Sequence, residues 1–255
     1  MSSKLSSFNG GSTVLIQGAS RGIGLGLVDA LLRDDAGFRV IATCRDPDTA
    51  DRLTALACDR LSIRALDVTA PDQLAPLAGE LKQQRTRLSL VINAAGILHG
   101  EGFGPEKKLE DLDASALQHV FAVNTFGPAL LLKALRPLMA RDGKCVFAAI
   151  SARVGSIGDN RLGGWYAYRA SKAALNQVMK TAAIELGRRN RNVIVAALHP
   201  GTTDTGLSAP FQANVPEEKL FSVERTCGYL LSVIDGLSSD DSGGFFGWDG
   251  RRIEW

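Results

Sequence analysis

The sequence is short of several features that would mark particular classes of protein. Its four cysteines are scattered without a C-x-x-C pair, which gives no basis for a disulfide framework or a cysteine-based metal site. No apolar run approaches the length of a membrane span, and residues 1–11 have no apolar core of the kind a signal peptide needs. The net charge of +2 is too small to favour nucleic acid or a membrane surface. We therefore expect a soluble, cytoplasmic, metal-free protein with residues 1–11 as a flexible tail.

The composition that remains is typical of a soluble enzyme. The chain has 255 residues, of which 45% are hydrophobic and 22% charged, enough for one large α/β domain. Strands are predicted at 13–17, 38–45, 61–68, 88–96, 143–151, 192–198 and 245–248, and helices at 23–33, 71–84, 114–139, 165–186 and 223–234. This alternation predicts a single domain over residues 12–255. Its expected fold is a Rossmann-like, doubly wound parallel sheet of about seven strands flanked by helices.

A glycine-rich turn joins the first predicted strand to the first helix. Gly18, Gly22 and Gly24 have the spacing G-x-x-x-G-x-G, which differs from the commoner G-x-G-x-x-G of dinucleotide sites. Gly18 allows a sharp turn, while Gly22 and Gly24 allow backbone N–H groups and a helix N-terminus to approach an anion. The pattern favours a phosphate-binding loop, and a plain connector is the alternative.

Two arginines near this turn bear on the choice of dinucleotide. NAD-selective units usually place Asp or Glu about 20 residues past the glycines. Here the second strand ends Thr43-Cys44-Arg45 without a carboxylate, and Arg21 lies inside the turn. Two guanidinium groups suit a 2′-phosphate, so they favour NADP(H), although each arginine alone could be a solvated surface charge. Asp67, at the end of the third strand, would either accept a hydrogen bond from an adenine amino group or cap the next helix.

The candidate acid–base group is a tyrosine. Tyr168 and Lys172 are four residues apart in a predicted helix, so both side chains project from one face. A phenol has a pKa of about 10 and is a poor acid–base near neutrality, but a nearby ammonium favours the phenolate and lowers that pKa. Asn124 lies in an apolar helix, either as a hydrogen-bonded core residue or as the holder of a water. Pro128 is expected to kink that helix and free the Asn124 carbonyl.

These motifs occur in the order typical of one enzyme family. They are Gly18-x-x-x-Gly22-x-Gly24, Asp67, Asn93-Ala94-Ala95-Gly96, Asn124, Ser151, Tyr168-x-x-x-Lys172 and Pro200-Gly201. In them the chain resembles the compact, single-domain branch of the short-chain dehydrogenase/reductase family. Residues 155–160 and 166–176 resemble the C-factor and sniffer-like carbonyl reductase group within it.

The resemblance implies an NADP(H)-dependent oxidoreductase that acts on a small-molecule carbonyl or alcohol, as a homodimer or homotetramer. Tyr168 would donate a proton to the carbonyl oxygen, and Lys172 would bind ribose hydroxyls and lower the pKa of Tyr168. Asn124 would position a water between Lys172 and solvent, and Ser151 would hold the substrate oxygen. The expected cofactor contacts are Gly18, Ser20, Arg21, Gly22, Ile23, Gly24, Arg45, Asp67, Val68, Asn93, Ala94, Gly96, Tyr168, Lys172, Pro200, Gly201, Thr203 and Thr205.

The serine departs from the family's pattern. The family usually places the substrate-binding serine second in a Ser-Ser pair, three residues before a glycine, and this sequence has Ala152 at that position. Three alternatives are open: the strand is shifted so that Ser151 points into the site, Ser156 substitutes from the loop, or the serine role is absent. Of the three alternatives we favour Ser151. A second class of function also stays open, namely an NADP(H)-binding regulatory or signalling protein of the C-factor type with little or no turnover.

The substrate pocket is expected to form from three loops. They span residues 97–113, 159–165 and 203–215, and Trp165 and Phe211 give the pocket an apolar component. No second domain follows the sheet, which argues against a sugar-nucleotide epimerase of the family's longer branch.

Overall fold

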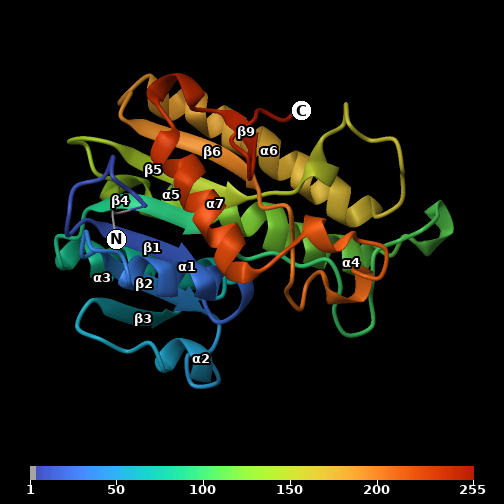
Figure 1. The fold of residues 1–255 in the computed structure, drawn as a ribbon, viewed down its shortest axis with the longest axis horizontal. Helices are drawn as coiled ribbons and strands as arrows, with labels where there is room; N and C mark the ends of the chain where they lie inside the picture. The colour runs from blue at the N-terminus through green and yellow to red at the C-terminus, as the bar shows by residue number, and fades with distance from the viewer. Residues whose placement is uncertain (1–3) are drawn as a thin grey trace.

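The computed structural model describes residues 4–255, and in them seven strands form one parallel sheet (Figure 1). The strand order is β3-β2-β1-β4-β5-β6-β9. The strands are β1 (Thr13–Gln17), β2 (Arg39–Cys44), β3 (Leu61–Ala65), β4 (Leu88–Asn93), β5 (Cys145–Ile150), β6 (Val193–His199) and β9 (Gly244–Gly247). The order reverses between β1 and β4, which is where doubly wound sheets bind their ligands. The predicted fold class is confirmed.

Helices cover both faces of the sheet. Side chains alternate along β1, so that Val14 and Ile16 pack towards α1 (Gly22–Leu32) and α7 (Val223–Gly236). Leu15 packs on the opposite face, whose core includes residues of α3 (Pro71–Gln83), α5 (Gly127–Leu135) and α6 (Tyr166–Gly187). Within residues 4–255 no helix is both long and apolar enough to cross a membrane.

Shorter elements complete the chain. Two more α-helices are α2 (Asp51–Thr54) and α4 (Ala114–Phe121), and β7 (Thr202–Thr203) pairs with β8 (Leu220–Phe221) outside the main sheet. The 3₁₀ turns are η1 (Leu109–Asp111), η3 (Arg136–Leu138), η4 (Arg153–Gly155), η5 (Ala209–Phe211), η6 (Glu217–Lys219) and η7 (Ser239–Asp241). Neither α2 nor the β7–β8 pair was predicted, because each is too short to show a hydrophobic period.

The single helix predicted over residues 114–139 is interrupted. A π-helical segment, η2 (Ala122–Phe126), separates α4 from α5, and the Gly127 N–H bonds the carbonyl of Ala122 five residues earlier. Pro128 follows directly and has no N–H to continue the α-helical pattern, which accounts for the break. The expected disturbance at Pro128 is confirmed, and it places Asn124 inside a π-turn.

The expectation of a flexible N-terminal tail is corrected for residues 4–11. Leu5 is fully buried and Phe8 is 7% exposed, and both belong to the core beneath α1 and α7. The Ser7 N–H also donates to the Asp235 carboxylate at 2.7 Å. These two buried apolar residues dock the segment on the core. They were missed because the segment is otherwise polar. Residues 1–3 lie outside the described residues.

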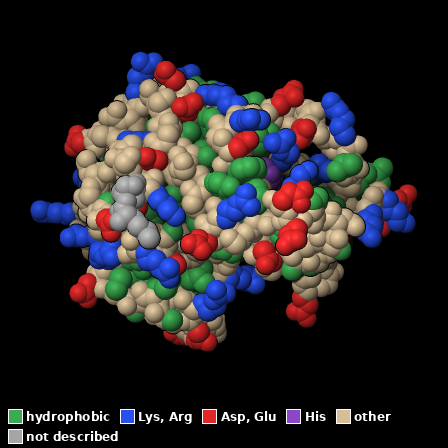
Figure 2. All heavy atoms as spheres, viewed as in Figure 1, with side chains coloured by type: hydrophobic (Ala, Val, Ile, Leu, Met, Phe, Trp, Pro, Cys, Tyr) green, Lys and Arg blue, Asp and Glu red, His purple; other side chains and the backbone are tan. Residues whose placement is uncertain are grey.

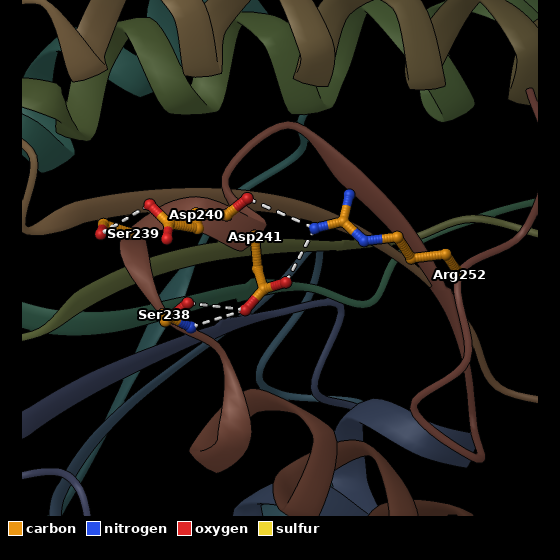
Figure 3. Close-up of polar contacts among 5 residues, drawn as sticks. All are labelled: Ser238, Ser239, Asp240, Asp241 and Arg252. Atoms are coloured by element: carbon orange, nitrogen blue, oxygen red, sulfur yellow. Dashed lines mark hydrogen bonds and ion pairs between the residues drawn. The ribbon is translucent and has the colours of Figure 1, made fainter.

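The chain folds back on itself after β9. The Ile253 N–H donates to the Phe245 carbonyl at 2.8 Å, and the Arg252 guanidinium donates to the Asp241 carboxylate at 2.8 Å (Figure 3). This return brings the Trp255 carbonyl to 3.0 Å from the Gly158 N–H, in the loop after β5. The last residues described therefore contact the chain directly before residues 159–165, one of the three loops expected to form the substrate pocket.

Candidate active site

The glycine turn after β1 is packed too tightly for larger residues. Gly18 has a φ of +83°, and a Cβ there would lie 2.7 Å from the Ala95 nitrogen. A Cβ on Gly24 would lie 2.1 Å from the Gly18 carbonyl oxygen. No side chain caps the start of α1 at Arg21, which leaves the first N–H groups of that helix available to an anion. The geometry suits a phosphate-binding turn.

A row of buried polar side chains lies at the ends of the central strands. Gln17 of β1 is in register with Thr43 of β2 and with Asn93 of β4. Gln17 Oε1, Thr43 Oγ1 and Asn93 Oδ1 are all buried and have no hydrogen-bond partner in residues 4–255. Buried polar atoms are rarely left unpaired, so this edge of the sheet is one that a polar ligand or ordered water completes.

Segments far apart in the sequence meet at this edge. A Cβ on Gly22 would lie 3.4 Å from Thr205 Cγ2, so the loop after β6 lies beside the glycine turn. A Cβ on Gly96 would lie 3.4 Å from Lys172 Nζ and 3.5 Å from Asn124 Oδ1. Glycine at position 96 thus brings the backbone close to the ammonium and to the Asn124 amide with no side chain between them, which would let a ligand lie against the backbone.

Tyr168 and Lys172 are both buried in the first turns of α6. Tyr168 is 8% exposed, Lys172 is 2% exposed, and Lys172 Nζ lies 5.7 Å from the centre of the phenol ring. The ammonium donates to the Ile150 carbonyl at 2.8 Å. Burial lowers the pKa of Lys172 to about 8 and raises the pKa of the Tyr168 phenol.

The raised pKa of Tyr168 corrects one expectation. Lys172 was expected to lower that pKa, but in the protein alone the loss of hydration dominates because a phenolate would be buried. The phenol is therefore neutral near pH 7. A neutral phenol is a proton donor, which is the state that reduction of a carbonyl requires.

The Asn124 side chain joins two parts of the site. Its Oδ1 accepts from the Ile97 N–H at 2.8 Å, and its Nδ2 donates to the Ile97 carbonyl at 2.9 Å and to Ser171 Oγ at 3.1 Å. Thr125 Oγ1 donates to the Ser171 carbonyl at 2.8 Å. The π-helical segment thus fixes α6 one residue before Lys172. The water expected between Lys172 and solvent stays a prediction, and neither Ser171 nor Thr125 was identified from the sequence.

The two candidate serines are both engaged within the protein. Ser151 is 2% exposed, and its hydroxyl donates to Asn176 Oδ1 at 2.7 Å. Ser156 is also 2% exposed, and its oxygen accepts from the Asp159 N–H at 3.1 Å. The single hydroxyl proton of Ser151 therefore points to α6, and the choice among the serine alternatives stays a prediction. Asn176 was not foreseen, because its partner lies on a strand 25 residues away.

The residues expected to select the dinucleotide are accessible. Arg21 and Arg45 are exposed, and no ion pair or side-chain hydrogen bond occupies either guanidinium in the described part of the chain. Asp67 Oδ1 accepts from the Thr69 N–H at 2.8 Å and from Thr69 Oγ1 at 2.7 Å. This closes a turn before α3, whose N-cap is Ala70, so Asp67 is not the helix cap itself.

The other expected cofactor contacts lie along the same edge of the sheet. Ser20 and Ile23 belong to the glycine turn and α1, Val68 follows β3, Ala94 follows β4, and Pro200, Gly201 and Thr203 follow β6. Thr203 is buried and its hydroxyl lies 2.9 Å from Thr226 Oγ1. His199 ends β6, and burial lowers the pKa of its imidazole to about 4, which keeps the ring neutral. Within residues 4–255 no group of His, Cys, Asp or Glu is arranged to hold a metal ion.

Aromatic rings from three segments form a chain of contacts that leads from the phenol. Ring centres are separated by 6.3 Å between Trp165 and Tyr168, by 5.1 Å between Trp165 and Phe211, and by 5.8 Å between Phe211 and His99. In Figure 2 a histidine, drawn purple, is visible in a recess among charged and hydrophobic side chains. The expected contribution of Trp165 and Phe211 to an apolar wall fits this arrangement.

The fold and the buried Tyr/Lys pair define a doubly wound α/β protein with a candidate proton-transfer site. The sequence model of the short chain dehydrogenase family matches residues 12–216, and the chain belongs to that family. It is 33% identical over 245 residues to 1-hydroxy-2-glutathionyl-2-methyl-3-butene dehydrogenase of Rhodococcus sp. (strain AD45), covering 96% of this chain and 100% of that protein. It is 32% identical over 168 residues to the C-signal protein of Myxococcus xanthus, covering 66% of this chain and 93% of that protein.

A solved structure is similar over nearly the whole chain. The NADPH-bound carbonyl reductase from chicken fatty liver superposes with a TM-score of 0.87 and is 31% identical. The match covers 98% of this chain and 96% of that one. The resemblance to short-chain dehydrogenases and carbonyl reductases that the motifs indicated is thus confirmed.

Proposed function

We propose that the protein is an NADPH-dependent reductase of a small-molecule ketone, aldehyde or quinone-like carbonyl, with Tyr168 as the general acid. The observation that carries this proposal is the buried, neutral phenol beside the Lys172 ammonium, which in turn lies close to the backbone of Gly96. A protonated phenol in a water-poor site can give its proton to a carbonyl oxygen as negative charge develops there.

The residues at the sheet edge fit NADP(H). The glycine turn and the uncapped start of α1 would hold the pyrophosphate, and the unpaired Arg21 and Arg45 would hold the 2′-phosphate. Lys172 would bind the ribose hydroxyls, with Gly96 leaving room beside it. When bound, NADPH would supply the hydride, a role consistent with the NADPH-bound carbonyl reductase of similar fold.

The first experiment is a titration with NADPH and NADH, followed by assays of NADPH oxidation with a panel of carbonyls. We expect tighter binding of NADPH and turnover of at least one carbonyl. Tyr168→Phe should lower kcat by about 10²–10⁴-fold and leave the NADPH Kd within about twofold, because it removes only the transferable proton. Tight NADPH binding without turnover of any carbonyl would contradict the proposal.

A regulatory or signalling role is the second candidate. Similarity to the C-signal protein favours it, as does the direction of the Ser151 hydroxyl, whose proton is donated to Asn176 and not to a substrate. Under this alternative, cofactor binding matters and turnover does not. Tyr168→Phe would then retain full biological activity, whereas a reductase would lose it.

Oligomeric state and location are further parts of the proposal. We propose a cytoplasmic homodimer or homotetramer, with residues 173–186 of α6 at an interface. Ile184 on this helix is 51% exposed and would be buried in such an interface. Size-exclusion chromatography with light scattering tests it, and a monomer at micromolar concentration would contradict it.

A further inference from the structure

Trp165, directly before α6, has an unusual backbone conformation. Its φ and ψ are 54° and 44°, which is the left-handed region, and it follows Gly163 and Gly164 with φ values of 66° and 63°. Glycine adopts this region freely, but an aromatic residue does so only when its surroundings hold it there. The chain therefore maintains a strained turn three residues before the candidate general acid.

Glu106, from the loop after β4, holds this turn. The Glu106 carbonyl accepts from the Trp165 N–H, and its carboxylate accepts from the Ala167 N–H at distances of 3.2 and 3.4 Å. A Cβ on Gly164 would lie 3.3 Å from the Glu106 carbonyl oxygen, so the close approach favours glycine there. One residue thus bonds the backbone on both sides of the start of α6.

The Glu106 carboxylate is itself in an unusual place. It is 5% exposed and forms no ion pair within residues 4–255. Burying a carboxylate without a cation is costly, and the N–H groups and positive end of α6 are what offset that cost here. A carboxylate that served only to close a loop would lose less hydration free energy on the surface than in this buried position.

The strained turn places the indole among the other rings of the site. Trp165 lies edge-on to Tyr168 and packs against Phe211, whose own neighbour is His99. His99 Nε2–H donates to the Leu207 carbonyl at 3.2 Å, so the loop after β4 also contacts the segment after β7. Any shift of Trp165 would alter the wall beside the phenol.

We propose that Glu106 is a positioning residue that holds Trp165 in its left-handed conformation, and that the indole is a specificity-determining contact for the carbonyl substrate. This rests on the proposed reductase function. The backbone carbonyl of Glu106 bonds Trp165 whatever the side chain, whereas the Glu106 side chain acts through its acceptor oxygens on the Ala167 N–H and not through its charge on Tyr168. A glutamine at position 106 therefore serves nearly as well, and an alanine does not.

A double-mutant cycle tests this proposal. Glu106→Ala should raise KM for the carbonyl about tenfold, with the NADPH Kd unchanged, and Glu106→Gln should stay within about threefold of the wild type. Trp165→Gly removes the indole and relieves the strained φ, so adding Glu106→Ala to it should change KM little further. Glu218→Ala, which removes an exposed carboxylate of η6 outside the three expected pocket loops, is the control and should leave KM unchanged.

Independent effects of Glu106→Ala and Trp165→Gly on KM would overturn the proposal. So would a parallel loss of NADPH binding, which would indicate a general structural role. A second readout needs no turnover. The tryptophan fluorescence of a protein minus that of the same protein carrying Trp165→Phe reports the indole of Trp165 alone. This difference should change when both proteins carry Glu106→Ala and should not change when both carry Glu106→Gln. If the wild type reduces no carbonyl, the reductase function and the specificity role both fail, while the emission result still decides whether Glu106 positions Trp165.

Discussion

The two halves of the site are built in different ways. The cofactor half, over residues 13–96, consists of strand ends and tight turns whose key contacts join neighbours in sequence or in the sheet, such as Gly24 against Gly18. The substrate half is assembled from loops that meet only in three dimensions, such as Glu106 against Ala167, which are 61 residues apart. The first half can therefore be recognised in the sequence as a motif. The second half cannot, because its contacts depend on how distant loops pack.

The largest expected effect is in the cofactor half. Gly24→Ala would place a Cβ 2.1 Å from a backbone oxygen that cannot move without opening the turn. We expect NADPH binding to weaken by at least about 100-fold, since a charge-assisted hydrogen bond to the phosphates contributes about 1.5–3 kcal/mol and several would be misplaced. Calorimetric titration measures it.

Gly79→Ala is the control for that substitution. Gly79 lies in α3 with open space around its Cβ direction, so alanine should stabilise the protein by ~0.5–1 kcal/mol and leave NADPH binding unchanged. Equal NADPH affinity in the Gly24 and Gly79 variants would show that the tight turn does not hold the cofactor.

The next largest effect concerns the dinucleotide selectivity of the same half of the site. Arg21→Ala and Arg45→Ala should each lower the NADPH/NADH affinity ratio by about tenfold or more, because each removes a charge-assisted contact to the 2′-phosphate. NADH binding should change little. An unchanged NADPH/NADH affinity ratio in the double variant would mean that neither guanidinium binds the 2′-phosphate.

In the substrate half, Ser151→Ala should lose far more activity than Ser156→Ala. Removing the Ser151 hydroxyl leaves the buried Asn176 amide without its partner, at a cost of about 1–3 kcal/mol, and disturbs α6 one turn after Lys172. Steady-state kinetics and urea denaturation of both variants measure the two effects. The reverse ranking of activities would assign the serine role to the loop.

The smallest effect lies at the boundary between the halves. Burial lowers the folded-state pKa of Lys172 to about 8 from the ordinary 10.5, so between these values the unfolded chain binds more protons and stability contributed by Lys172 rises with pH. Above pH 10 the raised pKa of Tyr168 acts in the opposite direction, because the unfolded chain releases the phenol proton first. Urea denaturation at pH 7.5 and 9.5 should show this gain in the wild type and not in Lys172→Met. A gain of equal size in the variant would assign it to other groups.

The sequence was sufficient for the parts of the molecule that repeat a period or a motif. All seven main strands were predicted, and β5, for instance, begins two residues later and ends one residue earlier than expected. The Tyr168/Lys172 pair was identified from its spacing together with the order of the other motifs. Docking of the N-terminal segment could not be seen, because Leu5 and Phe8 are isolated apolar residues without a period.

The contacts that sequence reasoning missed join distant segments. Nothing local distinguishes Glu106 from the other acidic residues of its loop, and its burial follows only from where α6 begins. The pKa of Tyr168 was expected to fall because the sequence reveals a neighbouring ammonium but not the depth of burial. Desolvation is a property of the whole packing, and here it outweighs the neighbour.

The return of the chain after β9 has a consequence for how specificity can change. The Trp255 carbonyl holds the Gly158 N–H, and the Trp255 ring stacks on Phe245 of β9, so the position of one substrate loop is tied to the last residues described. Residues 252–255 contact no part of the glycine turn. Under the proposed reductase function, we therefore expect substitutions in residues 252–255 to change the choice of carbonyl more than the affinity for the dinucleotide, which makes this segment a place to diversify a library of variants.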